Sequence, residues 1–403
     1  MTETDFRKRV VNRIVCGDCL DVMQDWPDSC VDLCVTSPPY WGLRDYGVEG
    51  QLGLEETPQE YIENMVAVFR EVYRVLADHG TLWLNMGSSY AAGGHNERSG
   101  DRQPKKAPPG FKPKDLVPVP WMLAMALQAD GWYLRSDIIW HKPNPMPESC
   151  RDRPTKAHDD LFLLSKKPRY FYDAEAIKEQ GSPNTHSRGK AGTGPDSAEI
   201  TYKSDQFGSG NRNNKDFQRY MGDRLIGTPR NKRSVWTIPT QAMPEAHVAT
   251  FPEKLVEPCI LAGTSAKGYC PNCGKPWNKE KGLEKGVCRD NAFNKLPASE
   301  RKAEYTTLGW RPTCDCGNDD VLRPGIVLDP FGGSGTVGVV AGRLKRDYVL
   351  IELSEAYAEN IARPRLAGME TGVPVAERRA GQGGLFDEDH GVAATGDGIN
   401  AKG

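Results

Sequence analysis

Residues 326–336 read IVLDPFGGSGT, an apolar run that ends in a glycine-rich turn. Residues 337–344 then predict a helix, and residues 348–352 (YVLIE) predict a second buried strand. A strand, a turn, a helix and a strand in this order form a βαβ unit, which brings backbone amides and a helix N-terminus close to a ligand. The sequence therefore predicts an α/β fold with a ligand site at this turn.

The second predicted strand ends in a carboxylate. Glu352 lies twenty residues after Gly332 (352 − 332), where an acidic residue of a βαβ unit takes ribose hydroxyls. The glycine spacing is not GxGxxG, so a dinucleotide is not the favoured ligand.

A second motif lies almost three hundred residues earlier. Residues 31–35 (VDLCV) predict a short buried strand, and TSPPYW follows at residues 36–41. Two consecutive prolines stop both ladder pairing and a helix, so the chain turns just past the carboxyl end of a strand, where α/β sheets bind ligands. Carbonyl oxygens, the Ser37 hydroxyl and the Tyr40 ring would suit the exocyclic amino group of a base. A purely structural turn is the alternative.

Together, TSPPYW and DPFGGSGT resemble the DNA amino-methyltransferases that use S-adenosylmethionine. The catalytic motif precedes the cofactor motif, as in the permuted, β-type arrangement of that family. Further segments resemble the family in the same order: VCGD (15–18), GTLWLN (80–85), IIWHKPNPMP (138–147), residues 153–172 and HVATFP (247–252). The resemblance covers most of residues 10–175 and 234–366.

The resemblance implies a Rossmann-like methyltransferase sheet with a catalytic half at 10–175, a target-recognition insert at 176–233 and a cofactor-binding half at 234–366. The cysteines predict a further, small zinc-binding insert at 268–318, and the excess of acidic residues near the C-terminus predicts a flexible acidic tail at 367–403. The implied catalytic residues are Ser37, Pro38, Pro39 and Tyr40. The implied cofactor-binding residues are Asp18 for the adenine and Glu352 for the ribose, with Asp329, Phe331, Gly332, Gly333, Gly335 and Thr336.

The proposed substrate is a base flipped out of double-stranded DNA, with Tyr40 as its stacking partner. Serine before Pro-Pro-Tyr resembles the cytosine-N4 branch of the family, and adenine-N6 stays the alternative. The basic, aromatic-containing segment 181–233 fits DNA contact, or else a disordered linker. A cognate restriction endonuclease would be a possible partner. A non-catalytic zinc-containing DNA-binding protein is the competing class of function.

Two cysteine pairs, each followed by glycine, predict a structural zinc site. Cys270 and Cys273 form a CxxC pair, and Cys314 and Cys316 form a CxC pair in an insert at 268–318. Cys288 is a possible substitute ligand. The other candidates for a chemical role are interpreted as packing residues: Cys259, within a helical pattern, and Cys16, Cys19, Cys30 and Cys34.

Composition agrees with an intracellular enzyme. The 403 residues carry a net charge of −2 and 38% hydrophobic residues, and no apolar run reaches the ~18 residues of a membrane span. The N-terminus lacks a signal-peptide pattern, and eleven scattered cysteines indicate a reducing compartment. We therefore expect a cytoplasmic protein without a membrane partner.

Overall fold

The computed structural model describes residues 1–43, 45–91, 107–180, 229–241, 251–283, 305–317 and 322–371. Its centre is an eight-stranded sheet in the order β1-β14-β13-β2-β3-β7-β6-β10. The strands are β1 (Arg13–Cys16), β2 (Val31–Thr36), β3 (Leu76–Met86), β6 (Tyr133–His141), β7 (His158–Ser165), β10 (Val235–Thr237), β13 (Ile326–Asp329) and β14 (Asp347–Glu352). Only β7 runs antiparallel to its neighbours within this sheet. The α/β fold predicted from the sequence is confirmed.

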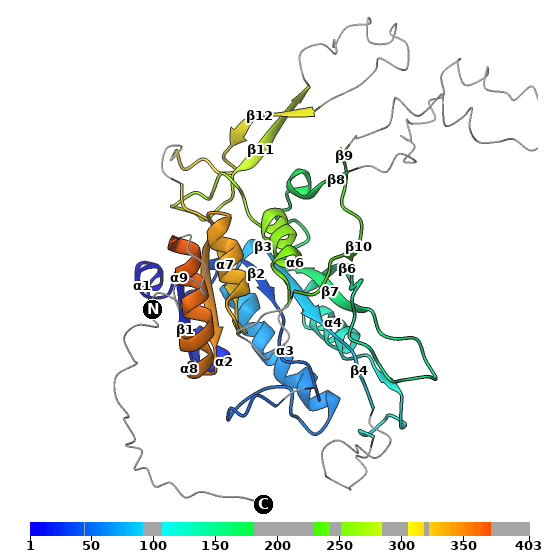
Figure 1. Ribbon diagram of the computed structural model, residues 1–403. Coiled ribbons are helices and arrows are strands. Elements are labelled where there is room, and N and C mark those ends of the chain that lie inside the picture. The colour runs from blue at the N-terminus through cyan, green and yellow to red at the C-terminus, as the bar shows by residue number, and fades with distance from the viewer. Residues whose placement is uncertain are drawn as a thin grey trace, which may run out of the picture.

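Helices cover both faces of the sheet (Figure 1). Successive residues of one strand pack on opposite sides, as Leu82 and Trp83 do, so the strands are buried on both faces. One core joins the sheet to α1 (Glu3–Arg9), α2 (Cys19–Gln24), α3 (Pro58–Val75) and α4 (Val119–Ala129). The other joins it to α6 (Glu253–Gly263), α7 (Thr336–Arg343) and α9 (Arg363–Thr371), and α8 (Glu355–Tyr357) precedes α9.

Helix α3 shows how the sequence fixes an element. Thr57 accepts from the backbone amide of Glu60, the Glu60 side chain accepts from the amide of Thr57, and Pro58 occupies the first turn. The periodicity of residues 58–77 predicts a helix with one apolar face, and that face is buried. However, the helix ends at Val75, two residues before the predicted end. Leu76 is already extended and pairs with Val31, because β3 begins there.

The carboxyl ends of the parallel strands form one edge of the sheet, and the two inserts leave from the opposite, amino edge. β7 ends at the amino edge, where the amide of Phe171 donates to the carbonyl of His79 near the start of β3. β10 also begins at the amino edge, because it runs parallel to β6. The short strands β8 (Glu179–Gln180) and β9 (Pro229–Arg230) pair at the base of the first insert. Residues 181–228 of the predicted recognition insert lie outside the described residues.

The cysteine insert also joins the body at the amino edge, between α6 and β13. Its hairpin, β11 (Asn278–Leu283) with β12 (Tyr305–Arg311), stands away from the sheet in Figure 1. The predicted acidic tail was placed from residue 367, but α9 continues to Thr371, and residues 372–403 lie outside the described part. Within the described residues, no helix combines the length and the apolar character needed to cross a membrane.

Candidate active site

Four neighbouring strands bring the predicted site residues to the carboxyl edge. Cys16 of β1 pairs with Glu352 of β14, and Cys34 of β2 pairs with Leu328 of β13. Asp18, Glu352, Asp329 and Ser37 therefore follow or end strands that lie side by side. The order of the strands reverses between β13 and β2, which is where open α/β sheets hold their ligands.

Residues 331–336, here called the glycine turn, lie close against β14. The amide of Gly332 donates to the carbonyl of Ile351 (2.7 Å), and a Cβ at Gly332 would lie 3.1 Å from that same oxygen. Gly333 has φ +49°, and a Cβ there would meet only the Phe331 carbonyl, at 3.8 Å. The turn thus needs glycine at 332 for close packing, and at 333 its backbone faces open space.

Glu352 holds the glycine turn from the neighbouring strand. Its Oε2 accepts from the amide of Gly333 (2.8 Å), and its Oε1 accepts from the amide of Ser354 (2.9 Å). Burial raises the pKa of Glu352, and these two hydrogen bonds oppose that rise. Each carboxylate oxygen keeps a lone pair for a further donor such as a ribose hydroxyl.

Asp18 lies beside Glu352 and caps α2. Its Oδ1 accepts from the amides of Leu20 (2.8 Å) and Asp21 (3.3 Å), and the amide of Gly17 donates to the Glu352 carbonyl (3.0 Å). The capping bonds fix Asp18 at the start of the helix, where the first backbone amides of α2 also point.

Asp329 is buried at the crossover between the two halves of the sheet. Its Oδ1 accepts from Thr36 Oγ1 (2.6 Å) and from the amide of Phe331 (3.1 Å), whereas its Oδ2 has no partner among the described residues. Burial raises the pKa of Asp329 to about 7. A buried acceptor without a partner costs free energy, so this oxygen fits a site that receives a donor from a ligand.

Residues 37–40, here called the proline turn, are held by their neighbours rather than by a backbone ladder. The Asn85 amide nitrogen donates to Ser37 Oγ (3.2 Å) and to the Tyr40 hydroxyl (2.9 Å). The Tyr61 hydroxyl donates to the Pro39 carbonyl (2.8 Å). The hydroxyl groups of Ser37 and Tyr40, both predicted site residues, therefore accept hydrogen bonds from the same asparagine.

Tyr40 is held on two sides. Its hydroxyl donates to Asp159 Oδ2 (3.3 Å), and that oxygen also binds Lys142 Nζ (2.5 Å). Burial, together with the Asp159 carboxylate, raises the pKa of Tyr40 well above its usual value, so the phenol stays neutral. A Cβ at Gly87 would lie 2.7 Å from the Tyr40 ring, so glycine is required where the backbone passes it.

Sequence reasoning gave no role to Asn85, Asp159, Lys142 or Gly87. Asn85 lies in a strand segment used for the resemblance, and its signal was a polar side chain near the carboxyl end of an apolar strand. Asp159 lies on β7 and Lys142 follows β6, so the pairing of β3 with β7 and of β7 with β6 brings both near the proline turn, whereas Gly87 directly follows β3.

Arg365 of α9 was also missed. Its Nη1 donates to the Ser334 carbonyl (2.6 Å), to Ser334 Oγ (3.0 Å) and to Thr336 Oγ1 (3.1 Å), and its Nη2 reaches Glu253 Oε1 (3.3 Å). The guanidinium thereby ties the glycine turn to the start of α6.

The two predicted cysteine pairs come together. The ligand atoms of Cys270, Cys273, Cys314 and Cys316 all lie within 4.8 Å of one another. Gly274 and Gly317, which follow the pairs, have φ +69° and +68°, a conformation that favours glycine. Burial raises the pKa of Cys270, but backbone amides of Cys273 and Asn272 lower it to about 7. Cys288, the alternative ligand, lies outside the described residues.

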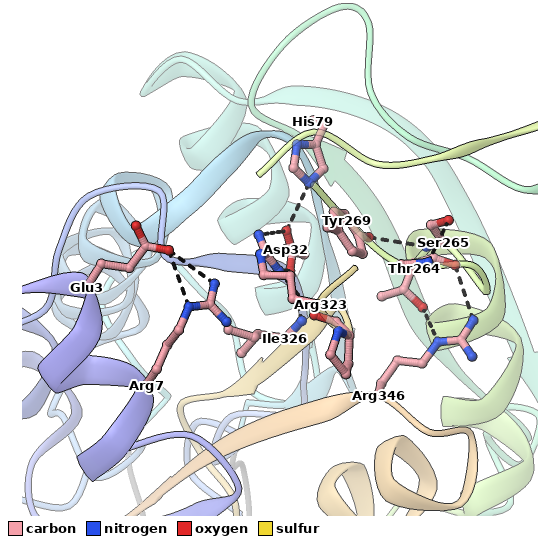
Figure 2. Close-up of polar contacts among 12 residues, drawn as sticks. Glu3, Arg7, Asp32, His79, Thr264, Ser265, Tyr269, Arg323, Ile326 and Arg346 are labelled. Atoms are coloured by element: carbon pink, nitrogen blue, oxygen red, sulfur yellow. Dashed lines mark hydrogen bonds and ion pairs between the residues drawn. The ribbon is translucent and has the colours of Figure 1, made fainter. Parts of the chain in front are cut away.

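The base of the cysteine insert is fastened to the start of β2. Figure 2 shows Asp32 between His79 and Arg323, with Tyr269 alongside. Asp32 accepts from both Arg323 nitrogens (2.5 and 3.0 Å) and from the amide of Ile326 (2.8 Å), and its Oδ1 lies 3.1 Å from His79 Nε2. Burial alone would raise the pKa of Asp32, but these partners lower it to about 2. Tyr269 and Arg323 also exchange two backbone hydrogen bonds.

The cysteines that were interpreted as packing residues are mostly buried. Cys259 is buried in α6, and burial raises its pKa well above the usual value, as expected for a packing residue. Cys19, Cys30 and Cys34 are buried as predicted. The prediction for Cys16 was wrong, because its position at the end of the edge strand β1 leaves it exposed.

Known DNA methyltransferases are similar to this chain in sequence. A sequence model of a DNA methylase family matches residues 31–270 and 322–363, which include both turns. Type II methyltransferase M.Cfr9I of Citrobacter freundii is 38% identical over 365 residues, covering 89% of this chain and 88% of that protein. Type II methyltransferase M.SmaI of Serratia marcescens is 38% identical over 363 residues, covering 88% and 90%. Among solved structures, PvuII DNA methyltransferase (cytosine-N4-specific) has a TM-score of 0.49 at 14% identity, covering 92% of this chain and 93% of that one.

Proposed function

This chain belongs to the DNA methylase family of S-adenosylmethionine-dependent amino-methyltransferases, and from that premise we propose that it methylates the N4 amino group of a cytosine flipped out of double-stranded DNA. The observation that carries the proposal is the pair of turns at one edge of the sheet. Thr36, next to the proline turn, bonds directly to Asp329, next to the glycine turn (2.6 Å). The proposed amino-group site and the proposed cofactor site therefore lie next to each other.

The residues around the glycine turn fit the cofactor. S-adenosylmethionine, when bound, supplies a methyl group on a positively charged sulfur. Glu352 would accept the ribose hydroxyls and Asp18 would contact the adenine. The unpartnered Oδ2 of Asp329 and the open face of Gly333 support placing the methionine end there.

The proline turn would prepare the amino nitrogen for attack. The lone pair of that nitrogen is delocalised into the ring, which makes it a poor nucleophile. Hydrogen bonds from its two N–H groups to Ser37 Oγ and to the Pro38 carbonyl would localise the lone pair and aim it at the methyl group. Because Tyr61 already occupies the Pro39 carbonyl, Pro38 supplies the carbonyl in this proposal. No covalent intermediate is needed.

The hydrogen bond from Asn85 determines which lone pair and proton of the Ser37 hydroxyl remain available to the base. With the Asn85 nitrogen donating to Ser37 Oγ, the serine hydroxyl keeps one lone pair for the amino group and one proton for a neighbouring acceptor. Cytosine N3 lies beside its amino group and is such an acceptor. Adenine N1 has the same relation to N6, so adenine-N6 methylation is the second candidate.

Nucleoside analysis separates these two candidates. We expect DNA from cells that express this chain to yield N4-methylcytosine when it is digested and measured by mass spectrometry, and sequencing of modified bases gives the recognition sequence. DNA that contains only N6-methyladenine would overturn the choice of base. DNA without either base would refute the proposed activity.

Cofactor binding gives a second prediction. Glu352→Ala should weaken S-adenosylmethionine binding by ~1.5–3 kcal/mol, the value of hydrogen bonds to a charged acceptor. Gly333→Val should also weaken it, because the new side chain occupies the open face of the turn and strains a backbone with φ +49°.

Isothermal titration calorimetry measures both variants. Gly131→Val is the matched control, since Gly131 also has positive φ (+109°) with nothing within 4 Å of a Cβ, at the end of α4 and away from the turn. Unchanged affinity in both Glu352→Ala and Gly333→Val would remove the glycine turn from the cofactor site.

Two further assignments rest on the same function. We propose that the four-cysteine cluster holds a structural zinc ion, because four thiolates leave no open coordination position for catalysis. We assign target recognition to residues 176–233, between the catalytic half (10–175) and the cofactor half (234–366). The relatives are type II methyltransferases, so a cognate restriction endonuclease is a proposed partner.

A further inference from the structure

The most exposed large apolar side chain of the described residues lies at the catalytic edge. Met146 is 85% exposed, and it stands in the segment 142–157 that joins β6 to β7. This segment starts and ends at the carboxyl edge, because β6 runs toward that edge and the antiparallel β7 runs away from it. The Met146 side chain is therefore accessible to a partner that binds at this edge.

The chain around Met146 is stiff. Pro145 and Pro147 flank it, so it follows one proline and precedes another, which restricts the backbone on both sides. Asn144 is bonded twice to Thr240: its Nδ2 donates to Thr240 Oγ1 (2.9 Å) and its Oδ1 accepts from the Thr240 amide (3.0 Å). Residues 144–147, here called the tip, therefore hold Met146 in a restricted conformation.

The other side of the segment is fastened to the residues that follow β3. The Arg153 guanidinium lies 3.7 Å from the centre of the Tyr90 ring and donates to Glu148 (2.7 Å). Lys156 Nζ donates to the Ser88 carbonyl (3.2 Å). These contacts hold the tip in place before any partner arrives, which lowers the entropy lost on binding.

The segment begins next to the proposed base site. Lys142, its first residue, binds the same Asp159 oxygen that accepts from the Tyr40 hydroxyl. Met146 lies four positions after Lys142, which limits the distance between their Cα atoms to about 14 Å. The segment 142–157 carries four basic residues, Lys142, Arg151, Arg153 and Lys156, against the acidic Glu148 and Asp152, so its net charge is positive and favours contact with phosphates.

We propose that Met146 is the wedge that enters the base stack of duplex DNA and fills the space left by the flipped target base. Apolar side chains, methionine among them, open base steps in this way in DNA-bending proteins. A rigid, solvent-exposed wedge would offset the cost of unpairing and unstacking the target. This proposal rests on the proposed function, because it presupposes that the target is taken from duplex DNA.

The test compares two substrates that carry the recognition sequence. In the first duplex the target base is correctly paired, and in the second it faces a mismatched base and is already partly open. Met146→Ala should slow methylation of the paired duplex by about tenfold or more and leave the mismatched duplex within about threefold of wild type, since a mispaired base is easier to flip. Met146→Leu, which keeps an apolar wedge, should stay close to wild type on both.

Met125→Ala is the matched control, because Met125 is 63% exposed but lies on α4. Equal rates for wild type and Met146→Ala on the paired duplex would overturn the proposal, and so would an equal loss on both duplexes. Wild-type protein that methylates neither duplex would refute the proposed function instead, whereas methylation of both by wild type leaves that function standing whatever Met146→Ala does.

Discussion

Ser37→Ala is expected to lose methyl transfer by about 10²–10³-fold, the usual effect of removing one positioned hydrogen-bonding group from a reacting centre. The Ser37 hydroxyl lies on the amino-group side of the site, where Asn85 donates to it. The affinity for S-adenosylmethionine should therefore stay near wild type. Single-turnover methylation and calorimetry on the same preparation measure the two quantities.

Tyr40→Ala should lose activity as severely, because it removes the stacking surface for the base. Tyr40→Phe keeps the ring and removes only the bonds to Asn85 and Asp159, so its loss should be smaller. Ser136→Ala on β6 and Tyr133→Ala, at a residue that is 44% exposed, are matched controls and should behave as wild type. Normal turnover by Ser37→Ala would remove the proline turn from the catalytic site.

Local patterns in the sequence predicted the parts of the fold that local physics decides. The βαβ unit from β13 to β14 follows from an apolar run, a glycine turn and a helix, and its close contact at Gly332 explains why glycine is there. The length of α3 was overestimated by two residues, because the pairing of Leu76 with Val31 ends the helix and helical periodicity does not report that pairing.

The missing parts of the site depend on contacts between distant segments. The antiparallel register pairs Asn85 with Leu161 and brings Asp159 to the proline turn, and the local sequence around Asp159 does not indicate this role. The buried cluster around Asp32 is similar: Arg323 reaches it across 291 positions of sequence. Spacing alone cannot predict such contacts.

The cysteine pairs were predictable because both half-sites are short local motifs, and they lead to the other prediction of large effect. We expect one zinc ion per chain in the purified protein by elemental analysis. Structural zinc sites contribute on the order of 10 kcal/mol of binding free energy to folding. Cys270→Ser or Cys316→Ser should therefore lower the zinc content and the melting temperature together.

The loss of stability should extend beyond the insert. Tyr269 precedes Cys270 directly and exchanges backbone hydrogen bonds with Arg323, which in turn holds the buried carboxylate of Asp32 at the start of β2. If the cysteine cluster loosens, Arg323 can move away from Asp32. The Asp32 carboxylate is costly to bury without a partner. Cys150→Ser is the matched control, because Cys150 lies outside the cluster and bonds to Asp152. A wild-type protein that is well folded and free of metal would show that these thiols have no role in metal binding.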